Sequence, residues 1–177
     1  FLYPELGLDL VTVMNHLNVQ VSYAKDQNCC GVPALYSGDK ETAIELAKQN
    51  IDAMLADDPD FVLTTCPTCT MALQRDFVDH LRDNPAWAAK AERLAEITVD
   101  AAGFIANQLG AAEEFKGLAQ QQKVTYHDSC HLTHGQKVTK QPRELLKLIP
   151  GLKLVELPEA NWCCGSAGIY NITQPEQ

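Results

Sequence analysis

Seven cysteines stand in tight groups along this sequence, and their spacing is its clearest chemical signal. Two adjacent pairs are each followed by glycine, at Cys29-Cys30-Gly31 and Cys163-Cys164-Gly165. Thiolates are soft ligands that bind zinc, copper(I) or iron–sulfur clusters, and adjacent thiolates suit a multinuclear centre better than one tetrahedral zinc ion. We therefore expect the cysteines to be metal ligands rather than nucleophiles. The expected ligands are Cys29, Cys30, Cys66, Cys69, Cys130, Cys163 and Cys164.

Three other interpretations of the cysteines stay open at this point. They could be small buried apolar residues, they could bind zinc, or Cys66-Pro67-Thr68-Cys69 could exchange thiol for disulfide. The odd count argues against a secreted disulfide scaffold, and the tight grouping is typical of metal or redox sites in a reducing compartment. Of the histidines near Cys130, we expect His127 and His134 to fix the loop by hydrogen bonds, while His131 could also supply a nitrogen ligand.

An internal repeat surrounds the two Cys-Cys-Gly sequences. Residues 8–17 have the spacing of an amphipathic helix and residues 19–23 alternate like a strand; a five-residue loop then leads to the first sequence. The same order recurs at 143–149 and 152–157, again with a five-residue loop before the second sequence. Equal order and equal loop length indicate an internal duplication.

Strands that alternate with helices predict an α/β fold with two duplicated Rossmann-like lobes and mainly parallel sheets. Cysteine loops that follow strands would then meet at the carboxyl ends of those strands. We expect a first repeat at 1–84 that lacks its first strand and cysteine, a helical connector at 85–119, and a second repeat at 120–177 that lacks its final helix, strand and Cys-x-x-Cys. The further expected elements are a helix at about 40–56 capped by Asp39, a strand at 61–64, a helix ending near Leu81 and a strand at 123–126.

Composition predicts a folded globular protein, with 46% hydrophobic and 21% charged residues in a chain of 177. A net charge of −9 argues against binding to nucleic acid or to an anionic membrane surface. No run approaches the 18 apolar residues of a membrane span, and the first residues lack a signal peptide, so we expect a cytoplasmic protein. The chain opens at Phe1 without an initiator Met, which suggests a fragment.

Cys-Cys-Gly, 34 residues and then Cys-x-x-Cys resembles the cysteine-rich CCG domain. That domain occurs in heterodisulfide reductases, in lactate utilisation proteins, and in the iron–sulfur subunits of anaerobic glycerol-3-phosphate dehydrogenase and glycolate oxidase. The stretches 126–136, 141–143 and 163–176 resemble the glycolate oxidase iron–sulfur subunit most closely. Residues 3–7 and 30–33 are more similar to the glycerol-3-phosphate and lactate branches.

The resemblance implies an oxidoreductase subunit that passes electrons from a flavin-containing partner subunit to quinone or another acceptor. It implies iron–sulfur clusters of the 4Fe-4S type, including the noncubane form, with zinc as the alternative, and a ferredoxin-like N-terminal region that is missing here. We expect incomplete clusters or none in this fragment, no nucleic-acid partner, no membrane span of its own, and contact with the inner face of the membrane through partners. A disulfide-cleaving subunit like that of heterodisulfide reductase and a structural zinc module are the alternative functions.

Overall fold

Two small parallel sheets organise the protein, whose computed structural model describes residues 3–108, 121–165 and 169–176. Strand β1 (Val62–Thr64) pairs with β2 (Thr98–Asp100), and β3 (Lys123–Val124) pairs with β4 (Lys153–Leu154). Parallel neighbours need a crossover connection, and helices supply it in both sheets. The prediction of an α/β protein is confirmed, whereas the duplicated Rossmann-like lobes and the three segment limits remain predictions.

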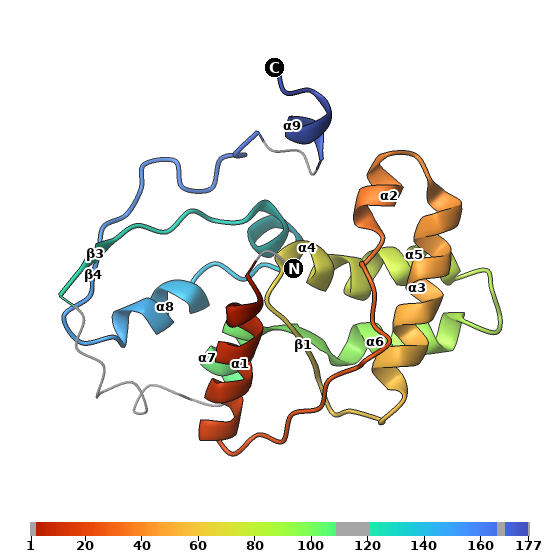
Figure 1. Cartoon of the computed structure of the whole chain (residues 1–177). Coiled ribbons are helices and arrows are strands. Elements are labelled where there is room, and N and C mark those ends of the chain that lie inside the picture. The colour runs from red at the N-terminus through yellow and green to blue at the C-terminus, as the bar shows by residue number, and fades with distance from the viewer. Residues whose placement is uncertain (1–2, 109–120, 166–168, 177) are drawn as a thin grey trace.

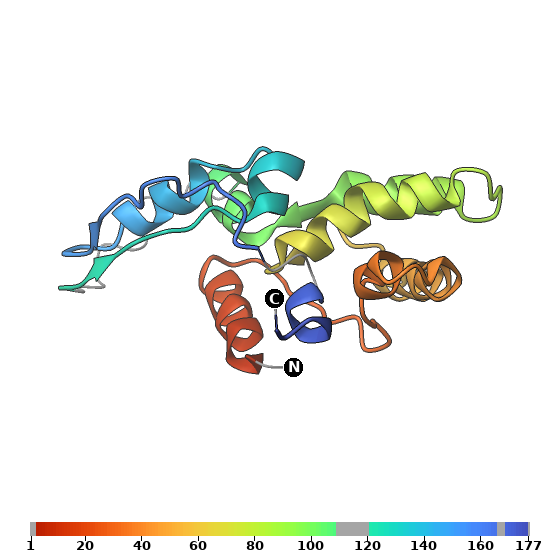
Figure 2. The same ribbon diagram turned by 90° about the horizontal axis from the view of Figure 1, so that it is seen from above.

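The helices and the two small sheets together give the molecule an elongated shape (Figure 1). In Figure 2, α4 to α6 form one row above α2 and α3, while β3, β4 and α8 extend the other way. No described helix combines the length and the apolar character needed to cross a membrane. The helices are α1 (Pro4–His16), α2 (Val32–Tyr36), α3 (Lys40–Leu55), α4 (Pro67–Met71), α5 (Phe77–Leu81), α6 (Ala88–Ile97), α7 (Ala101–Gln108), α8 (Gln141–Lys147) and α9 (Tyr170–Thr173), with π-helical turns η1 (Ala72–Asp76) and η3 (His131–Gly135).

Helix α3 forms where the sequence predicts it, because its signals are local. The Asp39 carboxylate accepts a hydrogen bond of 3.1 Å from the Thr42 N–H and caps the first turn. Ala43, Ala47 and Ile51 repeat at helical spacing and are buried. One polar side chain, Asn50, is fully buried on the same face.

The hydrophobic core lies in the first half, between α3, the continuous helix α4–η1–α5, and α6. Leu73, Phe77 and Leu81 point inward as predicted, and all are at most 3% exposed. The described part of the second half, 121–165 and 169–176, buries far less. Its buried side chains are Asp128, Leu132, Pro142 and Ala160. The loops of the second half therefore depend more on polar contacts, and less on apolar packing, than those of the first half.

Two expectations about the elements are corrected. Residues 19–23 alternate but form no strand, and Val21 and Tyr23 are 37% and 71% exposed. A pattern of alternation makes a strand only where a neighbouring strand supplies the hydrogen bonds. The segment 85–119, expected to be a helical connector, contains β2 as well as α6 and α7; its residues 109–119 lie outside the described part.

Strand β2 sits inside this Ala-rich segment because tertiary pairing overrides the local helical pattern. Its residues Thr98, Val99 and Asp100 align with the three residues of β1. The β-branched side chains of Thr98 and Val99 favour an extended backbone, and the Asp100 carboxylate then caps α7 through the N–H groups of Ala102 and Gly103. Helix α7 packs against α8, so this segment contacts both halves.

Candidate metal-binding cysteine site

The structure brings Cys30, Cys66 and Cys69 of the first half close to one another, although among the described residues they are not arranged to hold a metal ion. Cys29 and Cys30 lie in the loop before α2, and Cys66 and Cys69 flank the start of α4. The Cys69 thiol lies close enough to Cys30 and Cys66 for either sulfur to share its proton, and Cys29 adjoins Cys30 in the chain. The two segments are more than 35 positions apart in sequence, so the fold rather than the motif spacing creates this group.

The proximity of these thiols gives them different pKa values. Hydrogen bonding from Cys69, aided by the Cys69 and Thr68 N–H groups at the helix start, lowers the pKa of Cys66 to about 5. Hydrogen bonding from Cys69, together with the Val32 N–H, lowers the pKa of Cys30 to about 7 despite burial. The pKa of Cys69 is raised, because the neighbouring Cys30 and Cys66 sulfurs favour its protonated form and it is partly buried. At neutral pH the group therefore contains a thiolate at Cys66 and a protonated thiol at Cys69.

Two threonines fix the backbone at the start of α4. The Thr64 hydroxyl, at the end of β1, and the fully buried Thr70 hydroxyl share a hydrogen bond and both lie within hydrogen-bond distance of the Cys66 carbonyl. Thr70 N–H donates to the same carbonyl at 2.9 Å. The strand end thereby holds Cys66 at the helix N-terminus, where unpaired N–H groups favour a thiolate.

Gly31 is required by the turn that follows the first cysteine pair. Its φ is +81°, in the left-handed region, and a Cβ there would lie 3.2 Å from the Cα and the carbonyl oxygen of Ala43. The loop thus packs directly against the backbone of α3. Gly165 has the same φ of +81°, so the glycines of the two Cys-Cys-Gly sequences share a left-handed conformation, as the repeat predicts.

In the second half, Arg143 of α8 connects the Cys130 loop to the segment that leads to Cys163. Its guanidinium donates two hydrogen bonds of 2.7 Å to the Asp128 carboxylate and others to Glu156. It also lies 5.0 Å above the Tyr126 ring. This pairing lowers the pKa of Asp128, whose carboxylate is nearly buried.

Two more contacts hold the same segments side by side. Asp128 N–H donates to the Ala160 carbonyl at 2.8 Å, and His127 Nε2 lies 3.1 Å from the Trp162 carbonyl oxygen. Cys130 follows Asp128 by two residues, and Cys163 follows Trp162 directly. Cys130 is half-buried, whereas Cys163 and Cys164 are exposed, and the Cys163 sulfur accepts a hydrogen bond of 3.4 Å from Gly165 N–H.

The two halves meet at the start of α4. The Thr68 hydroxyl lies 2.6 Å from His131 Nδ1, and Gln136 Nε2 donates to the Pro67 carbonyl at 2.9 Å. Either the hydroxyl or the imidazole donates this hydrogen bond, depending on which ring nitrogen of His131 carries the proton. The expected loop-fixing hydrogen bonds are thus present for both His127 and His131.

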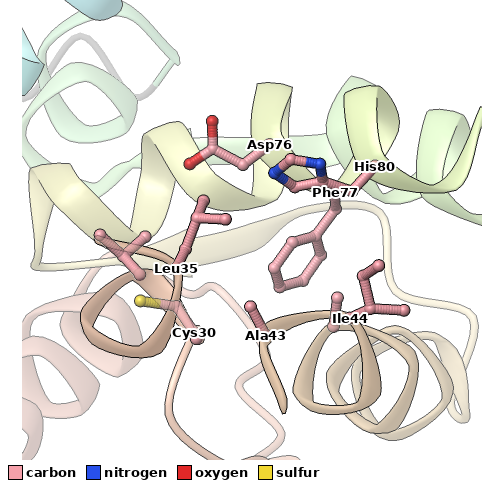
Figure 3. Close-up of a pocket in the computed structure, with 10 residues that line it drawn as sticks. Cys30, Leu35, Ala43, Ile44, Asp76, Phe77 and His80 are labelled. Carbon is pink, nitrogen blue, oxygen red and sulfur yellow. The ribbon is translucent and has the colours of Figure 1, made fainter. Parts of the chain in front are cut away.

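A small apolar pocket lies beside Cys30 (Figure 3). Its volume of about 10 Å³ is at the lower limit for one water molecule. Cys30 and Leu35 line one side, and Phe77, Asp76 and His80 come from the helix that continues from Cys69. Burial raises the pKa of Asp76, and its Oδ2 has no hydrogen-bond partner among the described residues.

The donor set fits an iron–sulfur cluster in its chemistry. All seven cysteines are free of disulfides, and the lowered pKa of Cys66 favours its thiolate at neutral pH. Within the described residues, no group of three or more His, Cys, Asp or Glu side chains is placed to hold a metal ion. Soft thiolates from two loops are nevertheless the ligands that iron–sulfur clusters require.

Three positioning residues were not recognised from the sequence. Asn50 holds the Cys29 loop, Arg143 holds the Cys130 loop, and Thr68 joins the halves. A signal existed for Asn50, since it is a polar residue on the apolar face of a predicted amphipathic helix. Arg143 and Thr68 carried no such signal, because their partners are 15 and 63 residues away.

A chain of this kind, with cysteine loops positioned by small parallel sheets and helix N-termini, is a cysteine-rich protein of the α/β class. It belongs to the CCG cysteine-rich domain family, whose pattern matches residues 1–74 and 124–177. Each matched segment contains one Cys-Cys-Gly sequence, and the expected family resemblance is confirmed.

Several of its relatives are named for lactate utilization or glycolate oxidation. Lactate utilization protein A of Bacillus velezensis is 35% identical over 167 residues, which cover 94% of this chain and 68% of that protein. A probable glycolate oxidase iron-sulfur subunit of Bacillus subtilis is 41% identical over 152 residues, covering 85% of this chain and 34% of that protein. The uncharacterized protein YkgE of Escherichia coli is 33% identical over 175 residues, which cover 99% of this chain and 72% of that protein. No solved structure shows a significant match.

Proposed function

We propose that this chain is the iron–sulfur electron-transfer part of an oxidoreductase that oxidises lactate or glycolate. Two of the relatives reported above carry those names, and one of them is named a probable iron–sulfur subunit. The observation that carries the proposal is the convergence of free cysteines from two distant segments, Cys30 from one and Cys66 and Cys69 from the other, in a chain of the cysteine-rich family.

In this proposal the cysteines of the first half hold one cluster, and Cys130, Cys163 and Cys164 contribute ligands from the second half. The cluster supplies reversible one-electron transfer when it is bound. Helix α4 favours the thiolate form of Cys66, and Thr64 and Thr70 hold the Cys66 backbone so that its sulfur does not have to reorganise. In the second half, the backbone segments that carry Cys130 and Cys163 are held by the contacts of Asp128, Arg143 and His127.

In the same proposal the 2-hydroxy acid is oxidised on a flavin-containing partner, because hydride transfer is chemistry that flavin and nicotinamide cofactors supply. Electrons would then pass from that flavin to the cluster and on to quinone or another acceptor. A cytoplasmic location belongs to the same proposal.

The first experiment tests cluster binding. The chain is reconstituted anaerobically with ferrous iron and sulfide and analysed for iron, sulfide, zinc and electron paramagnetic resonance. We expect bound iron and sulfide with a reducible signal, which Cys30→Ser and Cys66→Ser greatly reduce. Met71→Leu is the matched control, since it removes a sulfur from the same helix without removing a thiolate. Zinc binding in place of iron would support the structural zinc module instead.

The second experiment tests the direction of electron flow. The loaded protein is mixed with a flavin-containing lactate or glycolate dehydrogenase, and reduction of the cluster signal is followed after adding either 2-hydroxy acid. We expect reduction only when both the flavoprotein and a 2-hydroxy acid are present. Direct cleavage of a disulfide substrate by the reduced chain alone would favour the heterodisulfide-reductase-like function.

A further inference from the structure

The loop that carries Cys29 and Cys30 lacks regular backbone pairing, yet it must be held against α4 for Cys30 to reach Cys69. Its residues from 27 to 30 form neither helix nor strand, and Cys29 is exposed. The one fully buried polar side chain on α3, Asn50, lies directly behind this loop.

The Asn50 amide uses both of its ends on backbone groups. Its Oδ1 accepts from Asn28 N–H at 2.8 Å, and its Nδ2 donates to the Cys29 carbonyl at 2.9 Å. The second Nδ2 proton goes to the Leu46 carbonyl, also at 2.9 Å, one turn earlier on α3. If the amide were flipped, its NH₂ group would face the Asn28 N–H and its oxygen would face the two carbonyls, and no hydrogen bond could form. The three partners therefore fix the orientation of the Asn50 amide.

This arrangement joins a rigid helix to two peptide units of the loop, the one before Asn28 and the one between Cys29 and Cys30. The contact with Leu46 fixes the side chain on α3, and the other two contacts fix the loop relative to that helix. Because Asn50 is completely buried, water cannot replace either loop contact if the side chain is removed. Gly31 then brings the same loop within close packing distance of Ala43 on α3.

We propose that Asn50 is the positioning residue that holds the Cys29–Cys30 loop towards the Cys66–Cys69 turn, and so brings thiols of two distant segments together. This role concerns the thiols themselves. Its extension to the properties of a bound cluster rests on the function proposed above.

The test is a cross-linking measurement on the reduced, metal-free chain. A short bifunctional alkylating reagent is added, and mass spectrometry quantifies two products. One product joins the peptide of Cys29 and Cys30 to the peptide of Cys66 and Cys69. The other joins Cys66 to Cys69 within one helix start, which does not depend on Asn50 and is the internal reference.

Two variants remove the contacts in different ways. Asn50→Leu removes all three hydrogen bonds at similar volume. Asn50→Asp keeps the acceptor for Asn28 N–H but turns an oxygen towards the Cys29 carbonyl. Gln49→Ala is the matched control, because this neighbour bonds the Asn28 side chain, at 3.1 Å, rather than the loop backbone.

We expect the inter-segment product to fall about tenfold in Asn50→Leu, relative to the internal reference, and by a smaller factor in Asn50→Asp. Gln49→Ala should match the wild type. Circular dichroism verifies folding, and Asn50→Asp decides the result if Asn50→Leu does not fold. A wild-type yield in folded Asn50 variants, or an equal loss in Gln49→Ala, would overturn the proposal.

A spectroscopic arm extends the test to the reconstituted protein. If the chain takes up iron, Asn50→Asp should change the paramagnetic resonance spectrum of the reduced cluster while Gln49→Ala leaves it unchanged. An identical spectrum in Asn50→Asp would count against the extension to the cluster. If the wild type takes up no iron, the proposed function fails, but cross-linking still decides the role of Asn50.

Discussion

The Thr68 hydroxyl and His131 Nδ1 lie 2.6 Å apart and join two segments that are 63 residues apart in the sequence. Thr68 is inside the Cys-x-x-Cys turn of the first half, and His131 directly follows Cys130 of the second half. One hydrogen bond therefore connects cysteine-bearing segments of both halves. This relationship has a direct energetic consequence.

Thr68→Val should lower the free energy of unfolding by about 1 kcal/mol, the typical value for a partly buried hydrogen bond. Denaturant unfolding measures the change. A double-mutant cycle with His131→Leu should give a coupling energy of roughly 0.5–1.5 kcal/mol. Additive effects of the two substitutions would show that the contact contributes nothing.

Thr133→Val is the matched control for this measurement. Thr133 lies in the same π-helical turn as His131, and its buried hydroxyl has no hydrogen-bond partner among the described residues. Replacing an unsatisfied hydroxyl by a methyl group of the same shape should leave stability unchanged or raise it slightly. A loss equal to that of Thr68→Val would mean that this turn tolerates no substitution.

The thiols of the metal-free first half should react in a fixed order with pH. Because the pKa of Cys66 is lowered to about 5 and that of Cys30 to about 7, Cys66 should be alkylated at half-maximal rate near pH 5 and Cys30 near pH 7. Cys69, whose pKa is raised, should react last. Peptide mapping after timed alkylation gives the three profiles, and a Cys66 midpoint near about 8.5, the ordinary thiol value, would contradict the order.

Cys69→Ala tests the cause of these shifts. It removes the neighbouring thiol that contributes most to the low pKa of Cys66 and of Cys30, so both midpoints should move upward. A folded-state pKa below the unfolded value stabilises the protein above the unfolded pKa. For Cys66 this contribution is lost as the pH falls through about 5. At pH 6 the wild-type Cys66 should react readily and the Cys66 of the variant slowly.

Gly31→Ala should destabilise the protein more than Gly38→Ala. Both glycines have positive φ, +81° and +90°, so each alanine costs about 1–2 kcal/mol for the left-handed conformation. Only at Gly31 would the Cβ also meet backbone atoms of Ala43 at 3.2 Å, whereas no described atom lies within 4 Å of a Cβ at Gly38. We expect a total of about 2–4 kcal/mol at Gly31 by denaturant unfolding, and equal losses at both glycines would exclude close packing against α3.

Arg143→Lys should weaken the second half by about 2–3 kcal/mol, since lysine cannot donate two parallel hydrogen bonds to a nearly buried carboxylate. The Asp128 pKa is lowered by Arg143, so this contribution is present above the ordinary pKa of about 3.9 and is lost as the pH falls through the lower folded-state value. Unfolding measured against pH should therefore show a smaller acid-dependent loss in the variant.

Arg82→Lys is the control for Arg143→Lys. Arg82 pairs with Asp79 on the surface, where both side chains are mostly exposed, and such pairs contribute below about 1 kcal/mol. Its unfolding free energy should stay within about 0.5 kcal/mol of the wild type. If both substitutions had equal effects, the buried position of Asp128 would be irrelevant.

The amino-acid sequence by itself determined the features that depend on neighbouring residues. The cysteine groups and their chemistry follow from residue type and spacing. Helix α3 begins after Asp39 because a cap and an apolar face lie within one short stretch, and β1 and β3 occur where short β-forming runs precede cysteines. The shared φ of Gly31 and Gly165 likewise follows from a local turn.

Only the tertiary structure decided which distant residues meet. The grouping of Cys30 with Cys69 depends on the packing of α3 against α4–η1–α5, and no local pattern encodes that distance. Residues 19–23 had a strand pattern without a partner strand, while β2 formed inside a helical pattern because β1 lay beside it. The roles of Asn50 and Thr68 arise in the same way, since a buried side chain is positioned by partners that packing alone brings within hydrogen-bond distance.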